Sequence, residues 1–104
     1  MIAIACDHAG PALKEEIKAM LAEMGYTCKD FGTDTSDSVD YPVYASRAAR
    51  AVASGECEKG IVICTTGIGI SIAANKVKGI RCALLSDVVS ARLTREHNDT
   101  NMMA

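Results

Sequence analysis

Short apolar runs alternate along the chain with segments in which apolar residues recur every three or four positions. The runs predict buried strands at Ile2–Cys6 and 61–63, a strand at 80–85 and the beginning of another at 102–104, and a stretch of alternating character predicts a short strand at 26–31. The periodic segments predict helices at 11–24, 41–54, 71–74 and 87–96. Strand and helix alternate throughout, which is typical of a parallel sheet with helices on both faces. The pattern therefore predicts one α/β domain over residues 1–104.

Two of these helices carry predictions about which side chains face the core. In the first helix, the core-facing set is predicted to be Leu13, Ile17, Met20, Leu21 and Met24. Lys14 and the other charged residues of that helix are placed on its remaining faces. In the last helix, Ser86 is predicted as the N-cap, and Val89 and Leu93 are expected on the inner face because they lie four residues apart.

Composition narrows the classes of protein that the chain can belong to. Of its 104 residues, 49% are hydrophobic, with no Trp and one Phe, so the core is expected to be aliphatic. A net charge of −2 provides no basic field, which argues against a nucleic-acid partner. No apolar run approaches the roughly 20 residues of a membrane span, and no secretory signal is visible. Five cysteines without C-x-x-C spacing predict reduced thiols in the cytoplasm.

Residues 60–76 carry the strongest chemical signal, because an apolar strand there runs through a loop into a small-residue helix. The loop places Cys64 at the carboxyl end of the strand and just before the helix N-terminus. Ligands bind at this edge of open α/β sheets, and free N–H groups at a helix N-terminus favour anions. Three standard motifs are absent: Ile72 breaks the dinucleotide fingerprint, no Gly-Lys-Ser/Thr follows, and Ile70 stands where a Cys-loop phosphatase has arginine.

Polar residues follow three of the predicted strands and can meet at one edge of the sheet. They are Asp7 and His8 after the first strand, Cys64, Thr65 and Thr66 after the third, and Ser86 and Asp87 after the fourth. Each also has a purely structural explanation: Asp7 as a helix cap, His8 as a surface residue, the threonines as caps. Their predicted convergence favours a binding or catalytic site.

This set of residues suits proton abstraction next to a carbonyl group. Such a reaction needs a base within hydrogen-bond reach and donors aimed at the developing oxyanion. A helix N-terminus lowers a thiol pKa from about 8.5 towards roughly 3.5–7.5, so Cys64 is predicted to act as the base. The backbone N–H groups from Gly67 to Ser71 are predicted to hold the oxyanion, and the two glycines allow close approach of the ligand.

Five segments together resemble a known enzyme family. They are Cys-Asp-His-Ala-Gly at 6–10, Asp-Tyr-Pro at 40–42, Ile-Cys-x-Thr-Gly-Ile-Gly at 63–69, Ala-Ala-Asn-Lys at 73–76 and Arg-Glu-His-Asn-Asp at 95–99. The chain resembles the ribose-5-phosphate isomerase B family, which includes galactose-6-phosphate isomerase subunits. The resemblance implies a Rossmann-like three-layer α/β/α sandwich and an aldose–ketose isomerase without metal or cofactor. It also implies a sugar phosphate substrate and a homodimer or tetramer whose active sites are shared between subunits.

The resemblance also implies roles for individual residues. Cys64 matches the base that moves a proton between C1 and C2, Thr66 a hydroxyl near the reacting oxygens, and His97 a proton donor in ring opening. His97 and Asn98 are expected to come from the neighbouring subunit. The predicted substrate-binding residues combine those that the resemblance implies with those of the loop after Cys64. They are Asp7, His8, Tyr41, Thr65, Gly67, Ile68, Gly69, Ser71 and Asn98.

Two departures from the family keep alternatives open. Thr65 stands where the family usually has glycine, and a β-branched residue would be strained there if φ is positive. The family also continues beyond residue 104 with a strand and a helix bearing phosphate-binding arginines, which Arg81, Arg92 and Arg95 do not match. The sequence is therefore expected to be truncated, with an exposed sheet edge and poor solubility. Alternatives to ribose 5-phosphate isomerisation are another sugar phosphate substrate, such as galactose 6-phosphate or allose 6-phosphate, or a non-catalytic chain that binds a partner or a small anion.

Overall fold

The computed structural model describes residues 1–32 and 41–104, without the side chain of Tyr41. Asp40 of the Asp-Tyr-Pro segment therefore lies outside the described residues, and so does the predicted role of the Tyr41 side chain. The elements are β1 (Ile2–Cys6), α1 (Pro11–Glu23), β2 (Cys28–Asp30), α2 (Tyr41–Ala53), β3 (Lys59–Ile63), α3 (Ile68–Asn75), β4 (Cys82–Ala83), α4 (Val88–Leu93), the π-helical η1 (Thr94–Asn98) and β5 (Met102–Met103). None of the described helices combines the length and apolar character that crossing a membrane requires.

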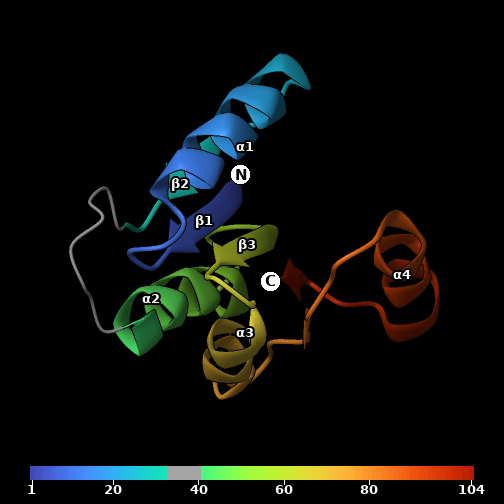
Figure 1. Ribbon diagram of the computed structural model, residues 1–104. Helices are drawn as coiled ribbons and strands as arrows, with labels where there is room; N and C mark the ends of the chain where they lie inside the picture. Colours follow the sequence, from blue (N-terminus) through green and yellow to red (C-terminus); the bar gives the residue numbers. More distant parts are fainter. Residues whose placement is uncertain (33–40) are drawn as a thin grey trace.

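The strands form one parallel sheet, which confirms the predicted α/β fold (Figure 1). Their spatial order is β2-β1-β3-β5-β4, so the last strand lies between β3 and β4. In the register of β1 with β3, Cys6 lies opposite Ile63. The residues that follow these two partners, Asp7 and Cys64, therefore leave the sheet side by side at its carboxyl edge.

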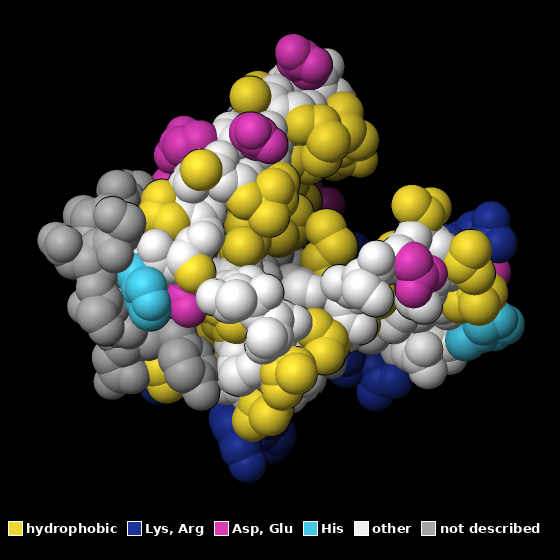
Figure 2. All heavy atoms as spheres, in the orientation of Figure 1, with side chains coloured by type: hydrophobic (Ala, Val, Ile, Leu, Met, Phe, Trp, Pro, Cys, Tyr) yellow, Lys and Arg dark blue, Asp and Glu magenta, His cyan; other side chains and the backbone are white. Residues whose placement is uncertain are grey.

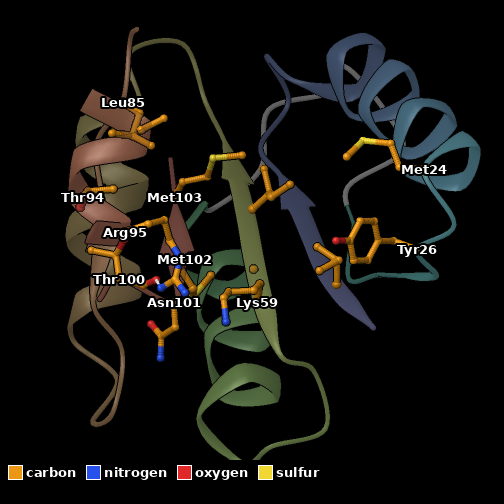
Figure 3. A pocket seen from close by; sticks show the side chains of 14 residues that line it. Met24, Tyr26, Lys59, Leu85, Thr94, Arg95, Thr100, Asn101, Met102 and Met103 are labelled. Carbon is orange, nitrogen blue, oxygen red and sulfur yellow. Dashed lines mark hydrogen bonds between the residues drawn. The ribbon is translucent and has the colours of Figure 1, made fainter. Parts of the chain in front are cut away.

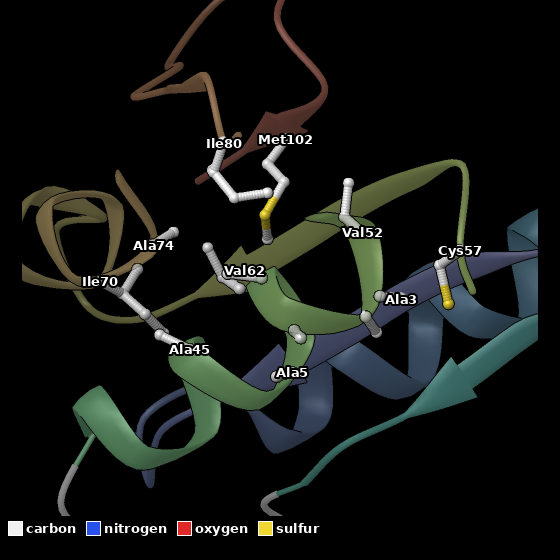
Figure 4. Packing of buried hydrophobic residues seen from close by; sticks show 13 residues of the cluster. Ala3, Ala5, Ala45, Val52, Cys57, Val62, Ile70, Ala74, Ile80 and Met102 are labelled. Carbon is white, nitrogen blue, oxygen red and sulfur yellow. The ribbon is translucent and has the colours of Figure 1, made fainter. Parts of the chain in front are cut away.

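Helices cover both faces of the sheet, as the alternation of elements predicts. On one face, α2 and α3 pack over Ala3, Ala5 and Val62 (Figure 4). On the other face, Leu21 of α1 packs with Ile2, Ile4 and Ile61. Successive β1 residues point to opposite faces of a strand, which separates the two alanines from the two isoleucines. The core side of α2 is itself made of fully buried alanines, Ala45, Ala48 and Ala49, which let the helix lie close to the sheet.

The prediction of which α1 side chains face the core was only partly right. Leu21 is buried and Ile17 half-buried, but Leu13, Met20 and Met24 are exposed. Lys14, placed by the pattern on an outer face, is 0% exposed. The buried stripe instead runs through Lys14, Ile17 and Leu21, at the three- and four-residue spacing of one helix face. The lysine lies inside because its Nζ is 2.9 Å from a carboxylate oxygen of Asp30.

Several element boundaries differ from the predicted ones. The two edge strands are shorter, with β2 at Cys28–Asp30 instead of 26–31 and β4 at Cys82–Ala83 instead of 80–85. Each edge strand pairs on one side only, and β4 pairs with the two-residue β5, so few partners are available to extend the ladder. In contrast, α3 begins at Ile68, earlier than predicted, because the left-handed turn at Gly67 leads directly into the helix.

The predicted helix at 87–96 is two segments, α4 followed by η1. Its cap is Asp87 rather than Ser86, because the Asp87 carboxylate accepts the Ser90 N–H at 2.7 Å. The prediction that Val89 and Leu93 face inward was wrong: both are exposed, and α4 contains no buried residue. This segment stands away from the two layers of helix that cover the sheet, so its apolar side chains have no core to enter (Figure 1).

Candidate active site

The Cys64 loop joins the end of β3 to the start of α3. Gly67 has φ of 77°, in the left-handed region, and its N–H donates to Cys64 Sγ at 3.2 Å. The half-buried Cys64 side chain packs at the margin of the apolar cluster beneath α2 and α3. Its sulfur thus lies at a helix N-terminus and receives a backbone N–H, an arrangement that stabilises negative charge.

Glycine at position 67 is required on two separate grounds. A positive φ strains residues that carry a Cβ atom. In addition, a Cβ at this position would lie 2.6 Å from Leu84 Cδ1 and 3.3 Å from the carbonyl carbon of Ala104. The loop therefore has the tight turn that brings its N–H groups and the sulfur together.

The loop after β1 borders the Cys64 loop, as the parallel sheet predicts. The Asp7 N–H donates to the Ile63 carbonyl at 3.1 Å, which ties the two strand ends together. The Asp7 side chain is 6% exposed, and its carboxylate accepts the Ala9 N–H at 2.8 Å. Asp7 therefore orders its own loop and does not cap α1, whose N-cap is Gly10. His8 is exposed beside it.

The two threonines and Ser71 occupy different environments. Thr65 and Thr66 are exposed, and Thr66 Oγ1 accepts the Ile68 N–H at 3.2 Å. Asp99 is the one non-glycine among the described residues with a positive φ, so the backbone strain considered for Thr65 is not found. Ser71 is buried, and its hydroxyl donates to the Ile68 carbonyl at 2.7 Å. The geometry thus gives Ser71 a role within α3 and leaves the threonine side chains accessible.

Several of the N–H groups predicted to bind an anion, those from Gly67 to Ser71, already donate hydrogen bonds within the chain. The Gly67 N–H goes to sulfur, that of Ile68 to Thr66, and that of Ser71 to the Gly67 carbonyl. In a helix that begins at Ile68, the N–H groups of Gly69 and Ile70 have no helical carbonyl one turn earlier. Ile70 is fully buried, so the N–H of the half-buried Gly69 is the donor that remains accessible to an anion.

His97 and Asn98 are not brought to the Cys64 loop within one chain. Both are exposed on η1, and the two histidine side chains of the chain lie at opposite ends of the face shown in Figure 2. Arg81, just before β4, donates from Nε to the Asn98 carbonyl at 2.8 Å, and this bond ties η1 to the sheet. Arg95 donates to the Asp99 carboxylate at 3.1 Å and to the Thr100 carbonyl, and these bonds order the chain between η1 and β5. A single chain therefore contains one part of the predicted site at the sheet edge and another part on η1.

Asn75 joins α3 to β4, a role that the sequence motifs did not predict. Its side-chain amide donates to the Cys82 carbonyl at 2.9 Å, and its Oδ1 accepts the Cys82 N–H at 2.8 Å. This paired contact fixes the end of α3 to β4. The segment Ala-Ala-Asn-Lys at 73–76 signalled the residue, but only the three-dimensional pairing shows its role.

The thiols of Cys64 and Cys82 are expected to react differently. Burial raises the pKa of Cys82 to about 11, so only about one part in a thousand is thiolate at pH 8. Iodoacetamide at pH 8 is therefore expected to modify Cys64 well before Cys82, measured by mass spectrometry of the peptides. The unfolded chain, in which both thiols react, is the control. Equal rates of modification of Cys64 and Cys82 in the folded protein would contradict the raised pKa of Cys82.

A groove of about 490 Å³ lies elsewhere on the molecule (Figure 3). It runs between the end of α1, with Met24 and Tyr26, and the segment that carries Leu85 and Thr94. Its floor includes Lys59, the first residue of β3, so it lies towards the amino end of that strand and away from Cys64. The groove is therefore separate from the candidate site. Among the described residues, no group of three or more His, Cys, Asp or Glu side chains is placed to hold a metal ion.

Comparisons with known proteins show what the chain is similar to. Residues 2–104 match a protein-family model described as Ribose/Galactose Isomerase. The chain is 56% identical over 103 residues to ribose-5-phosphate isomerase B of Escherichia coli (strain K12), covering 99% of this chain and 69% of that protein. A solved structure of Clostridium thermocellum ribose-5-phosphate isomerase B has a TM-score of 0.97 at 55% identity, covering 99% of this chain and 70% of that one. The Thermotoga maritima structure gives 0.94 at 47% identity, covering 98% and 70%.

Proposed function

Because this chain belongs to the ribose/galactose isomerase family, we propose that it is an aldose–ketose isomerase that interconverts ribose 5-phosphate and ribulose 5-phosphate. The observation that carries the proposal is the Cys64 loop. Its sulfur accepts the Gly67 N–H at the N-terminus of α3, and Asp7 leaves the neighbouring strand beside it. A base, an oxyanion donor and a carboxylate therefore share one edge of the sheet.

The reaction needs only proton transfers, which these groups can supply without a cofactor. The Cys64 thiolate removes the proton from C2 of the open-chain aldose, and the C–H electron pair forms the C1=C2 double bond of an enediolate. The aldehyde oxygen takes the negative charge, facing the N–H group of Gly69 at the start of α3. A proton passes from the C2 hydroxyl to this oxygen, and the Cys64 thiol returns its proton to C1, which gives the ketose and restores the thiolate.

The remaining predicted residues hold the sugar. We assign Thr66, an exposed residue of the loop, to the oxygens on C1 and C2. Asp7 and His8 are assigned to the ring oxygen and hydroxyl groups. We assign Tyr41, Thr65 and Ile68 to the lining of the site, the role that the family resemblance implies for Tyr41 and Ile68 and the position of Thr65 in the loop suggests.

We infer that the functional unit is a homodimer, with His97 and Asn98 of one subunit completing the site of the other. The inference is supported by their exposure on η1, in the segment after α4 that stands apart from β3 and α3, the elements joined by the Cys64 loop (Figure 1). It is also supported by α4, where Val88 and Val89 are 83% and 56% exposed next to this segment. Exposed apolar side chains of this kind favour a contact between subunits. The five cysteines are thiols, with no disulfide among the described residues, which favours the cytoplasm as the compartment.

The proposal is tested by incubating the protein with ribose 5-phosphate in deuterium oxide and following the products by nuclear magnetic resonance. We expect ribulose 5-phosphate to form and solvent deuterium to enter at C1, because a thiol proton exchanges with solvent between the two transfers. Galactose 6-phosphate and allose 6-phosphate are assayed in parallel. Turnover of a six-carbon substrate alone would reassign the substrate, and binding without turnover of any of the three would favour a non-catalytic chain.

A further inference from the structure

A buried ion pair joins α1 to the end of β2 and takes no part in the proposed reaction. Lys14 is 0% exposed, and its Nζ lies 3.0 Å from Asp30 Oδ1 and 2.9 Å from Oδ2. Lys18 reaches the same carboxylate at 3.0 Å from a more exposed position. A similar volume of apolar side chain is often at least as stabilising as a buried ion pair. Stability alone is therefore a weak reason for a lysine at this position, and the contacts of the pair indicate a positioning role.

The Asp30 carboxylate is connected to the start of the Asp7–Gly10 loop. Asp30 Oδ1 accepts the Gly32 N–H at 2.8 Å, which fixes the turn after β2. The carbonyl of Gly32 in turn accepts the Cys6 N–H at 2.7 Å, and Cys6 is the residue before Asp7. The position of Asp7 thus depends on a turn that the carboxylate orders.

Lys14 is connected to the other end of the same loop. It lies in the first turn of α1, and its backbone N–H donates to the Gly10 carbonyl at 2.9 Å. Its ammonium group draws this turn of the helix towards Asp30. One carboxylate therefore anchors both ends of the four-residue loop that carries Asp7 and His8.

We propose that the Lys14–Asp30 pair is a clamp that positions Asp7 and His8 for the substrate. The clamp rests on the proposed function only in assigning these two residues to substrate binding. Burial disfavours the charged form of Asp30, but hydrogen bonds from Lys14, the Gly32 N–H and Lys18 outweigh it and keep the pKa of Asp30 below its ordinary value. The carboxylate is therefore ionised at neutral pH, as the clamp requires.

The test compares Lys14→Met with Lys18→Met, which makes the same chemical change at the more exposed lysine. The loop amides of Asp7, Ala9 and Gly10 all donate hydrogen bonds, so their hydrogen exchange reports loop order. In Lys14→Met we expect these amides to exchange about tenfold faster and the KM for ribose 5-phosphate to rise about tenfold, with a smaller change in kcat. In Lys18→Met we expect both quantities to stay within about twofold of the natural protein.

A second variant separates positioning from folding. Lys14→Met combined with Asp30→Asn removes both charges and keeps an oxygen to accept the Gly32 N–H. We expect its thermal stability to return towards that of the natural protein while the loop amides still exchange about tenfold faster. Natural exchange rates and natural KM in either folded variant would overturn the clamp, and so would failure of both to fold. If the natural protein shows no isomerase activity, the exchange measurement still tests the clamp by itself.

Discussion

Replacing Cys64 by serine is expected to lower kcat for ribose 5-phosphate by about a thousandfold, within the range that a general base contributes. A serine hydroxyl has almost the same size and can still accept the Gly67 N–H, so the loop should keep its shape. It is a much weaker acid than a thiol and supplies almost no anion at neutral pH. The KM should change little, because the groups that bind the sugar are untouched. The initial rate of ribulose 5-phosphate formation measures the effect.

The matched control is Cys28→Ser, the same exchange of sulfur for oxygen on the edge strand β2. Cys28 is also half-buried but lies outside the Cys64 loop, so its variant should retain activity to within about twofold. A Cys64→Ser protein that turns over at the natural rate would show that another group removes the proton. Exchange of the C2 hydrogen with solvent at the natural rate in that variant would lead to the same conclusion.

The sequence predicted those parts of the fold that depend on local pattern. The run Ile2–Cys6 is buried at every position, and its prediction as the first strand is confirmed with the same boundaries. Strand order depends on pairing between distant segments, so nothing local indicated that β5 would lie between β3 and β4. The face of α1 was misjudged for a different reason. A count of apolar residues excludes a lysine from the core, and it cannot detect that Asp30 lies opposite Lys14 in the folded chain.

The candidate site was predictable only as far as parallel strands bring their carboxyl ends together. That rule predicts Asp7 beside Cys64, because each follows one member of the pair Cys6 and Ile63. It does not reveal which N–H groups are free. The left-handed turn at Gly67 commits its own N–H to sulfur, and the inward rotamer of Ser71 commits its hydroxyl to the helix. Such details depend on backbone angles and side-chain rotamers, which residue types do not determine.

If each active site is shared between two subunits, two inactive variants should regain activity when they are combined in one dimer. Cys64→Ala and His97→Ala proteins are each expected to lose most of their activity as homodimers, because every site then lacks one group. In a heterodimer of the two, one site combines the intact Cys64 of one subunit with the intact His97 of the other. A heterodimer purified through two different affinity tags should therefore recover about half of the natural activity per dimer, since one of two symmetric sites is restored.

A site shared between subunits and a site formed within one chain predict different activities for this heterodimer. If Cys64 and His97 acted within the same chain, each subunit of the heterodimer would still carry one defect, and activity would stay at the level of the single variants. The structure favours recovery because His97 is exposed on η1, in the segment that stands apart from β3 and α3, which the Cys64 loop joins. A heterodimer in which both variant changes lie on one subunit is the control, because sharing then leaves one defect in each site and activity should remain low. Recovery in the first arrangement and its absence in the second require a site that crosses the subunit boundary.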